Sequence, residues 1–248
     1  PNGVYCDAAI YSTQWNKPFS TGVGGFCIIS NIELVKDLKV INQELLHPTI
    51  TERLELRLLL ILNKLLLTDK TYWILLKLYR LFSRLGLVIG SSSNLEITSV
   101  KMPKDYFKSS SRVQFERGSK SIKGLDSVLD VRKKNALRYS QVLQFYKKYY
   151  VDYSFHEDHS FLKYPILIKD RKSFLLKAEK HHIKLGDWFV SPLHPVRCSL
   201  ESWLLNTSEI PNAVYLADHL LNLPTDVKNV DRVIDFIVAN IADFIDNG

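Results

Sequence analysis

Asp7-Ala-Ala-Ile-Tyr-Ser-Thr-Gln-Trp-Asn-Lys17-Pro-Phe-Ser-Thr-Gly-Val-Gly-Gly25 is the stretch of this chain that decides its fold. After Asp7 it continues with the apolar run Ala8 to Tyr11, passes through a polar loop that contains Lys17, and reaches a glycine-rich turn before a second apolar run, Phe26 to Ile29. Short apolar runs bounded by turn residues are typical of buried strands. The pattern predicts two short strands within residues 4–30, joined by the loop that carries Lys17.

Helices and strands are expected to alternate along the rest of the chain. The helix at 31–47 begins with Asn31 as its N-cap, and Thr51 is the expected cap of a Leu-rich helical segment at 51–85. The remaining expected elements are a long helix at 113–149, a strand at 162–168, and helices at 172–181, 199–207 and 227–245. Such alternation indicates an α/β chain.

Composition is that of an ordinary globular protein. The 248 residues include 46% hydrophobic and 24% charged residues, a balance that excludes disordered and fibrous classes. Three scattered cysteines, with no Cys-x-x-Cys pair, support neither a disulfide framework nor a zinc site. We therefore expect a cytoplasmic protein without a metal site.

The most apolar run, at residues 56–67, is interrupted by Arg57, Asn63 and Lys64. It falls short of the ~18 uninterrupted apolar residues that a transmembrane helix needs. We expect no integral membrane segment. The Leu-rich face is assigned to core or dimer packing, and association with a membrane surface is the alternative.

Positive charge is concentrated in one region. The whole chain carries a formal charge of +7, whereas residues 101–150 hold 13 Lys/Arg against four Asp/Glu. A basic region of this kind binds an anionic ligand or simply forms a solvated helix face. No nucleic-acid-binding motif accompanies it, so we expect no nucleic-acid partner.

Lys17 is the candidate catalytic residue. A lysine that reacts with an aldehyde must be neutral part of the time, which requires a semi-buried site. Ser12 and Gln14 are suitable donors for the phosphate of such an aldehyde. The alternative is that Lys17 is a solvent-exposed residue of a polar turn.

The stretch closely resembles the lysine segment of the fold-type-I sugar aminotransferases of the DegT–StrS family. The motif residues are Asp7, Tyr11, Ser12, then Lys17 five positions after the serine, and the turn at 21–25. Further segments resemble the family in the same order along the chain: 118–143, 164–171, 182–186, 192–194 and 221–224. The resemblance does not extend to residues 45–105, a segment that looks longer than in compact members of the family.

The resemblance implies pyridoxal 5'-phosphate (PLP) as the cofactor, bound by Lys17 as an internal aldimine. Ser12 would then bind the cofactor phosphate, and Gln14 the phosphate or the substrate. Lys17 would also shuttle the proton during transamination. Arg112, near the position of an Asn-x-Arg segment that family members supply from a second subunit, and His194, in a turn similar to the family's Pro-Leu-His turn, are the candidate substrate-binding residues. A structural, hydrogen-bonded role is the alternative for His194.

The resemblance further implies a nucleotide-linked keto sugar as substrate, glutamate as amino donor, and a homodimer. It assigns residues 1–110 to the C-terminal remainder of a large PLP-binding domain and residues 111–248 to a small α/β domain. Because family members hold the cofactor ring with residues before the lysine segment, we expect a fragment of a longer enzyme. The alternative function is a non-catalytic relative that binds an anionic ligand or partner through residues 101–150.

Overall fold

The computed structural model describes residues 5–66, 71–75, 77, 81, 107–196 and 199–247. The chain forms two compact units, Pro1–Asp126 and Ser127–Gly248. The boundary expected near residue 110 therefore lies inside the first unit. Much of the second half of the Leu-rich segment lies outside the described residues.

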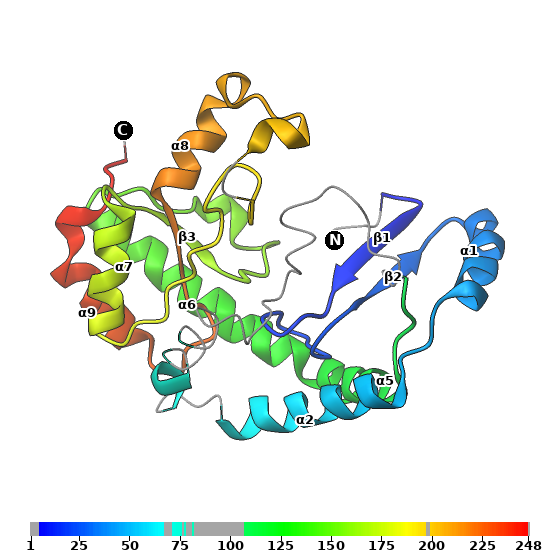
Figure 1. Ribbon diagram of the computed structural model, residues 1–248. Helices are drawn as coiled ribbons and strands as arrows, with labels where there is room; N and C mark the ends of the chain where they lie inside the picture. The colour runs from blue at the N-terminus through cyan, green and yellow to red at the C-terminus, as the bar shows by residue number, and fades with distance from the viewer. Residues whose placement is uncertain are drawn as a thin grey trace. The chain divides into compact units, whose positions relative to one another are not determined.

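The first unit is built around a β-hairpin, drawn in blue in Figure 1. Strands β1 (Ala8–Ser12) and β2 (Gly25–Ile29) pair antiparallel, with Ala8 opposite Ile29 and Ser12 opposite Gly25. This confirms the two strands predicted on either side of the Lys17 loop.

Both faces of the hairpin are apolar. On one face Tyr11 stacks on Phe26 with ring centroids 5.0 Å apart, and on the other Ile10 lies opposite Cys27. Ile10 is 87% exposed and Ile28 is 51% exposed. Strands that are apolar on both faces are typical of sheets covered on both sides.

Two helices of the first unit follow the hairpin. Helix α1 (Ile32–Glu44) is capped as predicted, because the Asn31 side chain accepts a hydrogen bond from the Glu33 amide at 2.9 Å. The predicted N-cap of α2 (Ile50–Leu66) is wrong by two residues. Thr49, and not Thr51, is the cap, since the Thr49 hydroxyl and the Glu52 carboxylate each bond the other's backbone amide. This reciprocal pair is a capping box.

The long helix expected at 113–149 is interrupted. It divides into α5 (Arg112–Ser121), a 3₁₀ turn at Ile122–Gly124, and α6 (Leu125–Phe145). Helix α6 ends early because Lys147 adopts a left-handed φ of 54°. The Lys148 amide then bonds the Leu143 carbonyl at 2.8 Å, a closing contact typical of helix C-termini.

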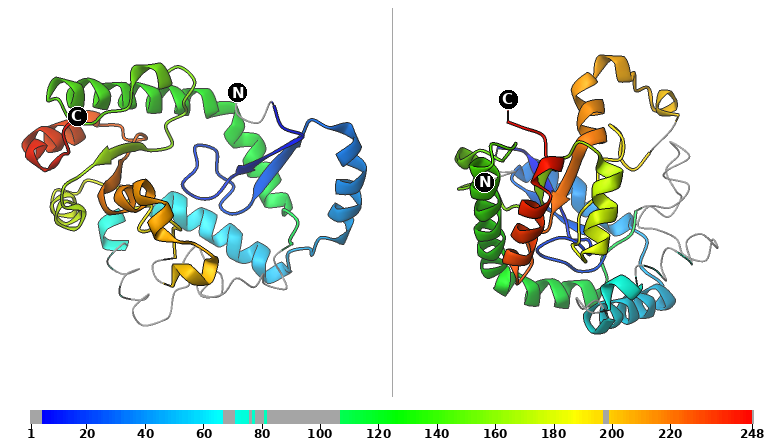
Figure 2. Two further views of the ribbon diagram at one scale, coloured as in Figure 1. Left: turned by 90° about the horizontal axis from the view of Figure 1, so that it is seen from above. Right: turned by 90° about the vertical axis from the view of Figure 1, so that its left-hand side faces the viewer.

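The second unit packs helices around a short sheet. Strands β3 (Tyr164–Leu167) and β4 (Leu220–Leu223) pair antiparallel. Helices α6, α7 (Arg171–Lys180) and α9 (Val230–Ala239) lie around this pair (Figures 1 and 2). Their apolar faces form the core, whose fully buried members include Tyr139, Leu143, Ile166, Leu221 and Ile237.

Buried polar side chains tie α6 to this core. The Arg132 guanidinium is 3% exposed and donates to the Leu162 carbonyl, the Thr225 hydroxyl and the Asp226 carboxylate. Burial lowers the pKa of Arg132, and Asp226 partly offsets this effect. The Tyr139 hydroxyl donates to the Pro224 carbonyl at 2.8 Å.

The strand predicted at 162–168 and the helices predicted at 172–181 and 227–245 are confirmed with shifted bounds. The helix expected at 199–207 is instead two 3₁₀ turns, Leu200–Trp203 and Thr207–Glu209. Helix α8 (Pro211–His219) was not predicted, although a proline at a first helical position is a start signal. Helix α9 is shorter than the predicted 227–245, because Asn229 caps its start and Asn240 follows its end. None of the helices in the described part of the chain has the length and apolar character that crossing a bilayer requires.

Candidate active site

The loop that carries Lys17 is a closed turn at the end of the hairpin. The Thr13 amide donates to the Gly24 carbonyl at 3.0 Å, and the Thr21 amide donates to the Thr13 carbonyl at 2.9 Å. Inside this closure, the Lys17 amide donates to the Gln14 carbonyl at 3.0 Å. The backbone thus holds the lysine between two fixed strand ends.

Two buried hydroxyls lie beneath the turn. Thr13 is 3% exposed and Thr21 is 7% exposed, and their Oγ1 atoms are 2.7 Å apart. Thr21 donates its hydroxyl proton to the Val23 carbonyl at 3.0 Å. Thr13 must therefore be the donor in the bond between the two hydroxyls.

Glycine is required at the closing side of the turn. Gly22 and Gly24 adopt φ values of 95° and 89°, a region that side chains with a Cβ rarely adopt. A Cβ on Gly25 would lie 2.5 Å from the Tyr11 carbonyl oxygen. The glycines of the motif thus allow β2 to return close to β1 directly after the loop.

Side chains of helix α5, which is distant in the sequence, form hydrogen bonds to the same turn. The Gln114 side chain donates to the Val23 carbonyl at 2.9 Å, and Arg117 Nε donates to the Ser20 carbonyl at 3.1 Å. Gln114 also accepts from the Ser111 amide at 2.7 Å. Neither residue was predicted as part of the site. The Ser111-x-x-Gln114 spacing of a capping box was an available signal for Gln114, whereas nothing in the sequence indicated Arg117.

Three of the predicted site residues come together on this turn. Ser12 is exposed at the end of β1, and its hydroxyl lies 3.5 Å from the Gln14 amide. Gln14 is also exposed, and its backbone pairs with Gly22. Lys17 is half-buried. The turn therefore presents a hydroxyl, an amide and an amine from one short segment.

The two predicted substrate-binding residues belong to different units of the chain. Arg112 is the first residue of α5, and its Nε pairs with the Glu116 carboxylate at 2.7 Å. His194 is exposed in the second unit, where its Nδ1 lies 3.4 Å from the Val190 amide. Arg112 lies in the same unit as Ser12 and Lys17, whereas His194 belongs to the second unit.

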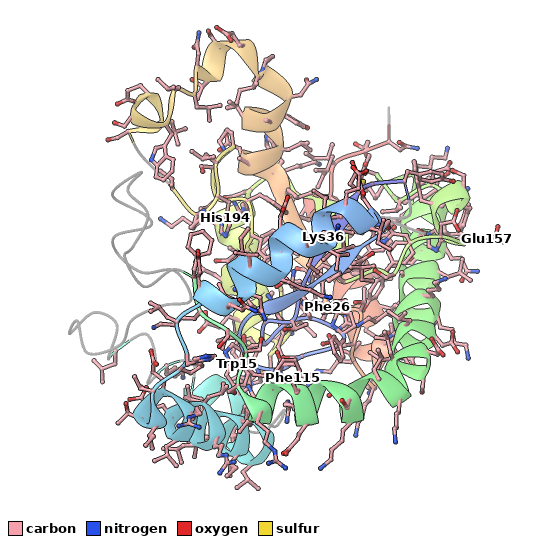
Figure 3. All side chains as sticks on the ribbon, turned by 90° about the vertical axis from the view of Figure 1, so that its right-hand side faces the viewer. Trp15, Phe26, Lys36, Phe115, Glu157 and His194 are labelled. Atoms are coloured by element: carbon pink, nitrogen blue, oxygen red, sulfur yellow. The ribbon has the colours of Figure 1, made fainter. Side chains whose placement is uncertain are left out.

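Two pockets adjoin the turn within the first unit. One, of about 280 Å³, lies between the hairpin and α5 and is lined by Thr13, Phe19, Phe26 and Phe115 among others. Figure 3 labels Phe26 on the hairpin and Phe115 on α5. The other, of about 460 Å³, is more polar.

The polar pocket is lined by the glycine turn, α2 and the segment before α5, including Glu52 and Lys108. The Lys108 amine lies 2.7 Å from the Glu52 carboxylate. The hydrogen bond from Lys108, with further bonds from Thr49, lowers the pKa of Glu52 to about 2. The carboxylate beside the turn is therefore ionised and paired at neutral pH.

Two histidines of the second unit at a His-x-x-His spacing, His156 and His159, have structural contacts. His156 Nε2 lies 3.0 Å from the Ser140 hydroxyl, and His159 Nδ1 accepts from the Phe161 amide at 2.9 Å. Among the described residues, no three His, Cys, Asp or Glu side chains gather as metal ligands would.

A family model matches residues 113–242 of the chain. It is the model of the DegT/DnrJ/EryC1/StrS aminotransferase family. Among curated proteins, no sequence matches the chain.

Solved structures share the fold. One is the PMP form of Spr1654 from Streptococcus pneumoniae, which is named as a sugar aminotransferase. It is 15% identical with a TM-score of 0.61, and the match covers 96% of this chain and 53% of that chain. A second is sugar aminotransferase CalS13 from Micromonospora echinospora, with 17% identity and a TM-score of 0.55. The match covers 97% of this chain and 54% of that chain. A third is E. coli GDP-4-keto-6-deoxy-D-mannose-3-dehydratase with bound hydrated PLP, with 15% identity and a TM-score of 0.54. The match covers 96% of this chain and 55% of that chain.

These likenesses confirm the expected α/β fold of the PLP-dependent sugar aminotransferases. The chain spans about half the length of the structures that it matches.

Proposed function

Because the chain belongs to the DegT/DnrJ/EryC1/StrS aminotransferase family, we propose that it acts in the transfer of an amino group to a nucleotide-linked keto sugar, with PLP as cofactor and glutamate as donor. The observation that carries the proposal is the closed turn that holds Ser12, Gln14 and Lys17 together. The names of the matched structures, which include a GDP-keto-sugar enzyme with PLP, support the substrate class and the cofactor.

The donor set of the turn fits PLP. An amine and a hydroxyl on one rigid segment suit a small aldehyde that carries a phosphate. The absence of a side chain at Gly22 lets the turn pack closely on Leu56 and Trp15, because a Cβ there would lie 3.1 Å from both. Lys17 would hold the cofactor through its amine, Ser12 would donate to its phosphate, and Gln14 would support the phosphate or the substrate.

Bound PLP supplies an electron sink that labilises a hydrogen on the carbon next to the substrate nitrogen. The part of this chain is to move that proton. Once the substrate's nitrogen had taken its place on the cofactor, the freed Lys17 amine would accept this proton and return it at a second carbon, a role suited to a half-buried amine on a fixed backbone. The Thr13 and Thr21 hydroxyls keep the backbone of the turn in place for this task.

The test is cofactor attachment. The chain is incubated with PLP, bound cofactor is fixed by borohydride, and the modified peptide is located by mass spectrometry. We expect modification at Lys17 and its loss in Lys17→Ala. Lys36→Ala, at an exposed lysine on α1 (Figure 3), is the matched control and should leave the labelling unchanged. Labelling spread over surface lysines, or none at Lys17, contradicts the proposal.

The alternative function, binding of an anion through residues 101–150, receives less support. Many described cations of this region already have partners within the chain: Lys108, Arg112, Arg132, Arg138 and Lys148 with carboxylates, and Arg117 and Lys133 with backbone carbonyls. Exposed pairs of this kind are individually weak. Their number nevertheless reduces the free positive charge.

A homodimer is part of the proposal, since closed two-fold dimers are the commonest homo-oligomers. Helix α2 supports it with exposed Leu54, Leu58 and Leu65, which are 56%, 56% and 64% exposed. Light scattering at micromolar concentration is the measurement, and a monomer contradicts the proposed homodimer.

A cytoplasmic location also remains a proposal, supported by the few scattered cysteines.

A further inference from the structure

A pocket of about 470 Å³ lies on the second unit, along one side of α9. Helices α7 and α9 lie side by side (Figures 1 and 2), and the pocket includes the residue at which α7 ends. Its volume falls within the range of roughly 300–1,000 Å³ that small-molecule sites occupy. None of its lining residues is among those proposed to hold the cofactor or the sugar substrate.

The most buried lining residues are apolar. Phe236 and Ile183 are 5% and 4% exposed, and Ala239 follows Phe236 by three positions on the same helix. The His181 imidazole extends this surface, because its ring lies against that of Phe236 with centroids 5.6 Å apart. An apolar group of a ligand would therefore be removed from water here, which favours binding.

Two opposite charges stand at the edge of this apolar surface. Arg232 and Asp235 line the pocket, are both exposed, and lie three residues apart on α9, a spacing that places them on one face of the helix. Within the described part of the chain they form no ion pair with each other, and a cation that precedes an anion is the less favourable order along a helix. Arg232 Nη2 donates instead to the His181 carbonyl at 2.7 Å. The guanidinium is thus held in place by the end of α7.

The acceptors of the pocket are separate from this cation. Asn240 Nδ2 donates to the Phe236 carbonyl at 2.8 Å, which fixes the amide and leaves its Oδ1 as an acceptor. Among the described residues, none donates a hydrogen bond to the Asp235 carboxylate or to the Asn240 Oδ1 atom. The pocket therefore combines one anchored cation, two acceptors and an apolar surface.

We propose that this pocket binds a free α-amino acid with an apolar side chain. The ligand's carboxylate pairs with Arg232, its ammonium is bound by Asp235 and the Asn240 amide oxygen, and its side chain covers Phe236. Hydrogen bonds between ionised groups are the strong ones in such sites. The site goes beyond the proposed transfer of an amino group, since it shares no residue with the Lys17 turn.

The two charges select this class of ligand over simpler ones. A plain carboxylate would meet Arg232 but would also lie near the like charge of Asp235. A plain amine would have the same difficulty with Arg232. A peptide does not carry a free ammonium and a free carboxylate on one carbon. Only a zwitterion with a short distance between its charges satisfies both side chains at once.

The experiment titrates the full chain with three probes in a calorimeter: L-leucine, leucinamide, which lacks the carboxylate, and 4-methylpentanoate, which lacks the ammonium. Leucine should bind at least about tenfold more tightly than either relative, the scale of one hydrogen bond to a charged group. Arg232→Gln should weaken leucine about tenfold and leave leucinamide unchanged. Asp235→Asn should weaken leucine by a similar factor and should not weaken 4-methylpentanoate.

Matched controls come from an ion pair outside the pocket, Arg138 with Asp231. Arg138→Gln and Asp231→Asn should leave leucine binding unchanged. Asp235→Asn alters an exposed side chain, so it decides the question even if Arg232→Gln fails to fold.

Several results would overturn the inference. These are no leucine binding by the unchanged chain at millimolar concentration, equal affinity for leucine and 4-methylpentanoate, and unchanged leucine affinity in Asp235→Asn. Cofactor attachment at Lys17 should be the same in all these variants. A chain that takes up no PLP but binds leucine in the expected pattern refutes only the proposed function.

Discussion

Replacing the two buried threonines beneath the Lys17 turn one at a time should give unequal losses of stability. The donor order runs from Thr13 to Thr21 and then to the Val23 carbonyl. In Thr21→Val the Thr13 hydroxyl loses its acceptor in a buried site, which costs about 1–3 kcal/mol. In Thr13→Val the Thr21 hydroxyl still donates to Val23, so the loss is one ordinary hydrogen bond, about 0.5–1.5 kcal/mol.

The Val23 carbonyl does not change this comparison. It also accepts from the Gln114 side chain at 2.9 Å, so it keeps a partner in either variant. In the double variant both hydroxyls are gone and no buried donor is left unsatisfied. The combined loss should therefore be smaller than the sum of the single losses by about 1 kcal/mol, as is usual for groups in one network.

The assay combines urea denaturation with hydrogen exchange of peptides that cover residues 13–24. The exchange data localise the loss, because the amides of Thr13 and Thr21 are both bonded within the turn. PLP attachment at Lys17 should weaken in the same order as the stability. Equal losses in the two single variants, or losses that add fully in the double variant, would refute the donor order and the buried network built on it.

Three further predictions follow from particular contacts. Gly25→Ala places a Cβ 2.5 Å from the Tyr11 carbonyl oxygen and should destabilise the hairpin by more than 2 kcal/mol, roughly, seen as faster exchange of the β1 amides. Gly124→Ala meets nothing within 4 Å and should raise the free energy of unfolding by about 0.5–1 kcal/mol; a loss would contradict a helical backbone there. Burial lowers the pKa of His156 from its usual 6.5, so the unfolded chain takes up this proton first as the pH falls. Stability should therefore decrease below about pH 6.5, and His156→Gln, which keeps a donor for Ser140, should flatten this part of the pH profile measured by thermal melting.

Local patterns in the sequence were reliable for the hairpin and for several helices. The spacing of apolar runs placed β1 and β2, and Asn31 marked the start of α1. The cap of α2 was misplaced because two threonines stand two residues apart. Only the reciprocal bonds with Glu52 identify Thr49 as the cap.

The interruption between α5 and α6 illustrates a second limit. Helical periodicity continues across Ile122–Gly124, so the sequence pattern favours one long helix. The structure tightens these residues into a 3₁₀ turn and ends α6 at a left-handed Lys147. Lysine gives no local signal for this conformation, since glycine is the residue that usually adopts it.

The sequence by itself determined the Lys17 turn, because its features are local. The five-residue spacing from Ser12 to Lys17 and the glycines at positive φ act through the covalent chain. Only the tertiary structure decided what supports that turn: Gln114 and Arg117 reach it from 91 and 97 residues away. It also decided that the Arg171 guanidinium bonds the carbonyls of three consecutive residues, Asp187, Trp188 and Phe189. Contacts between distant segments depend on how whole elements pack, and packing leaves no periodic trace in the residues that make them.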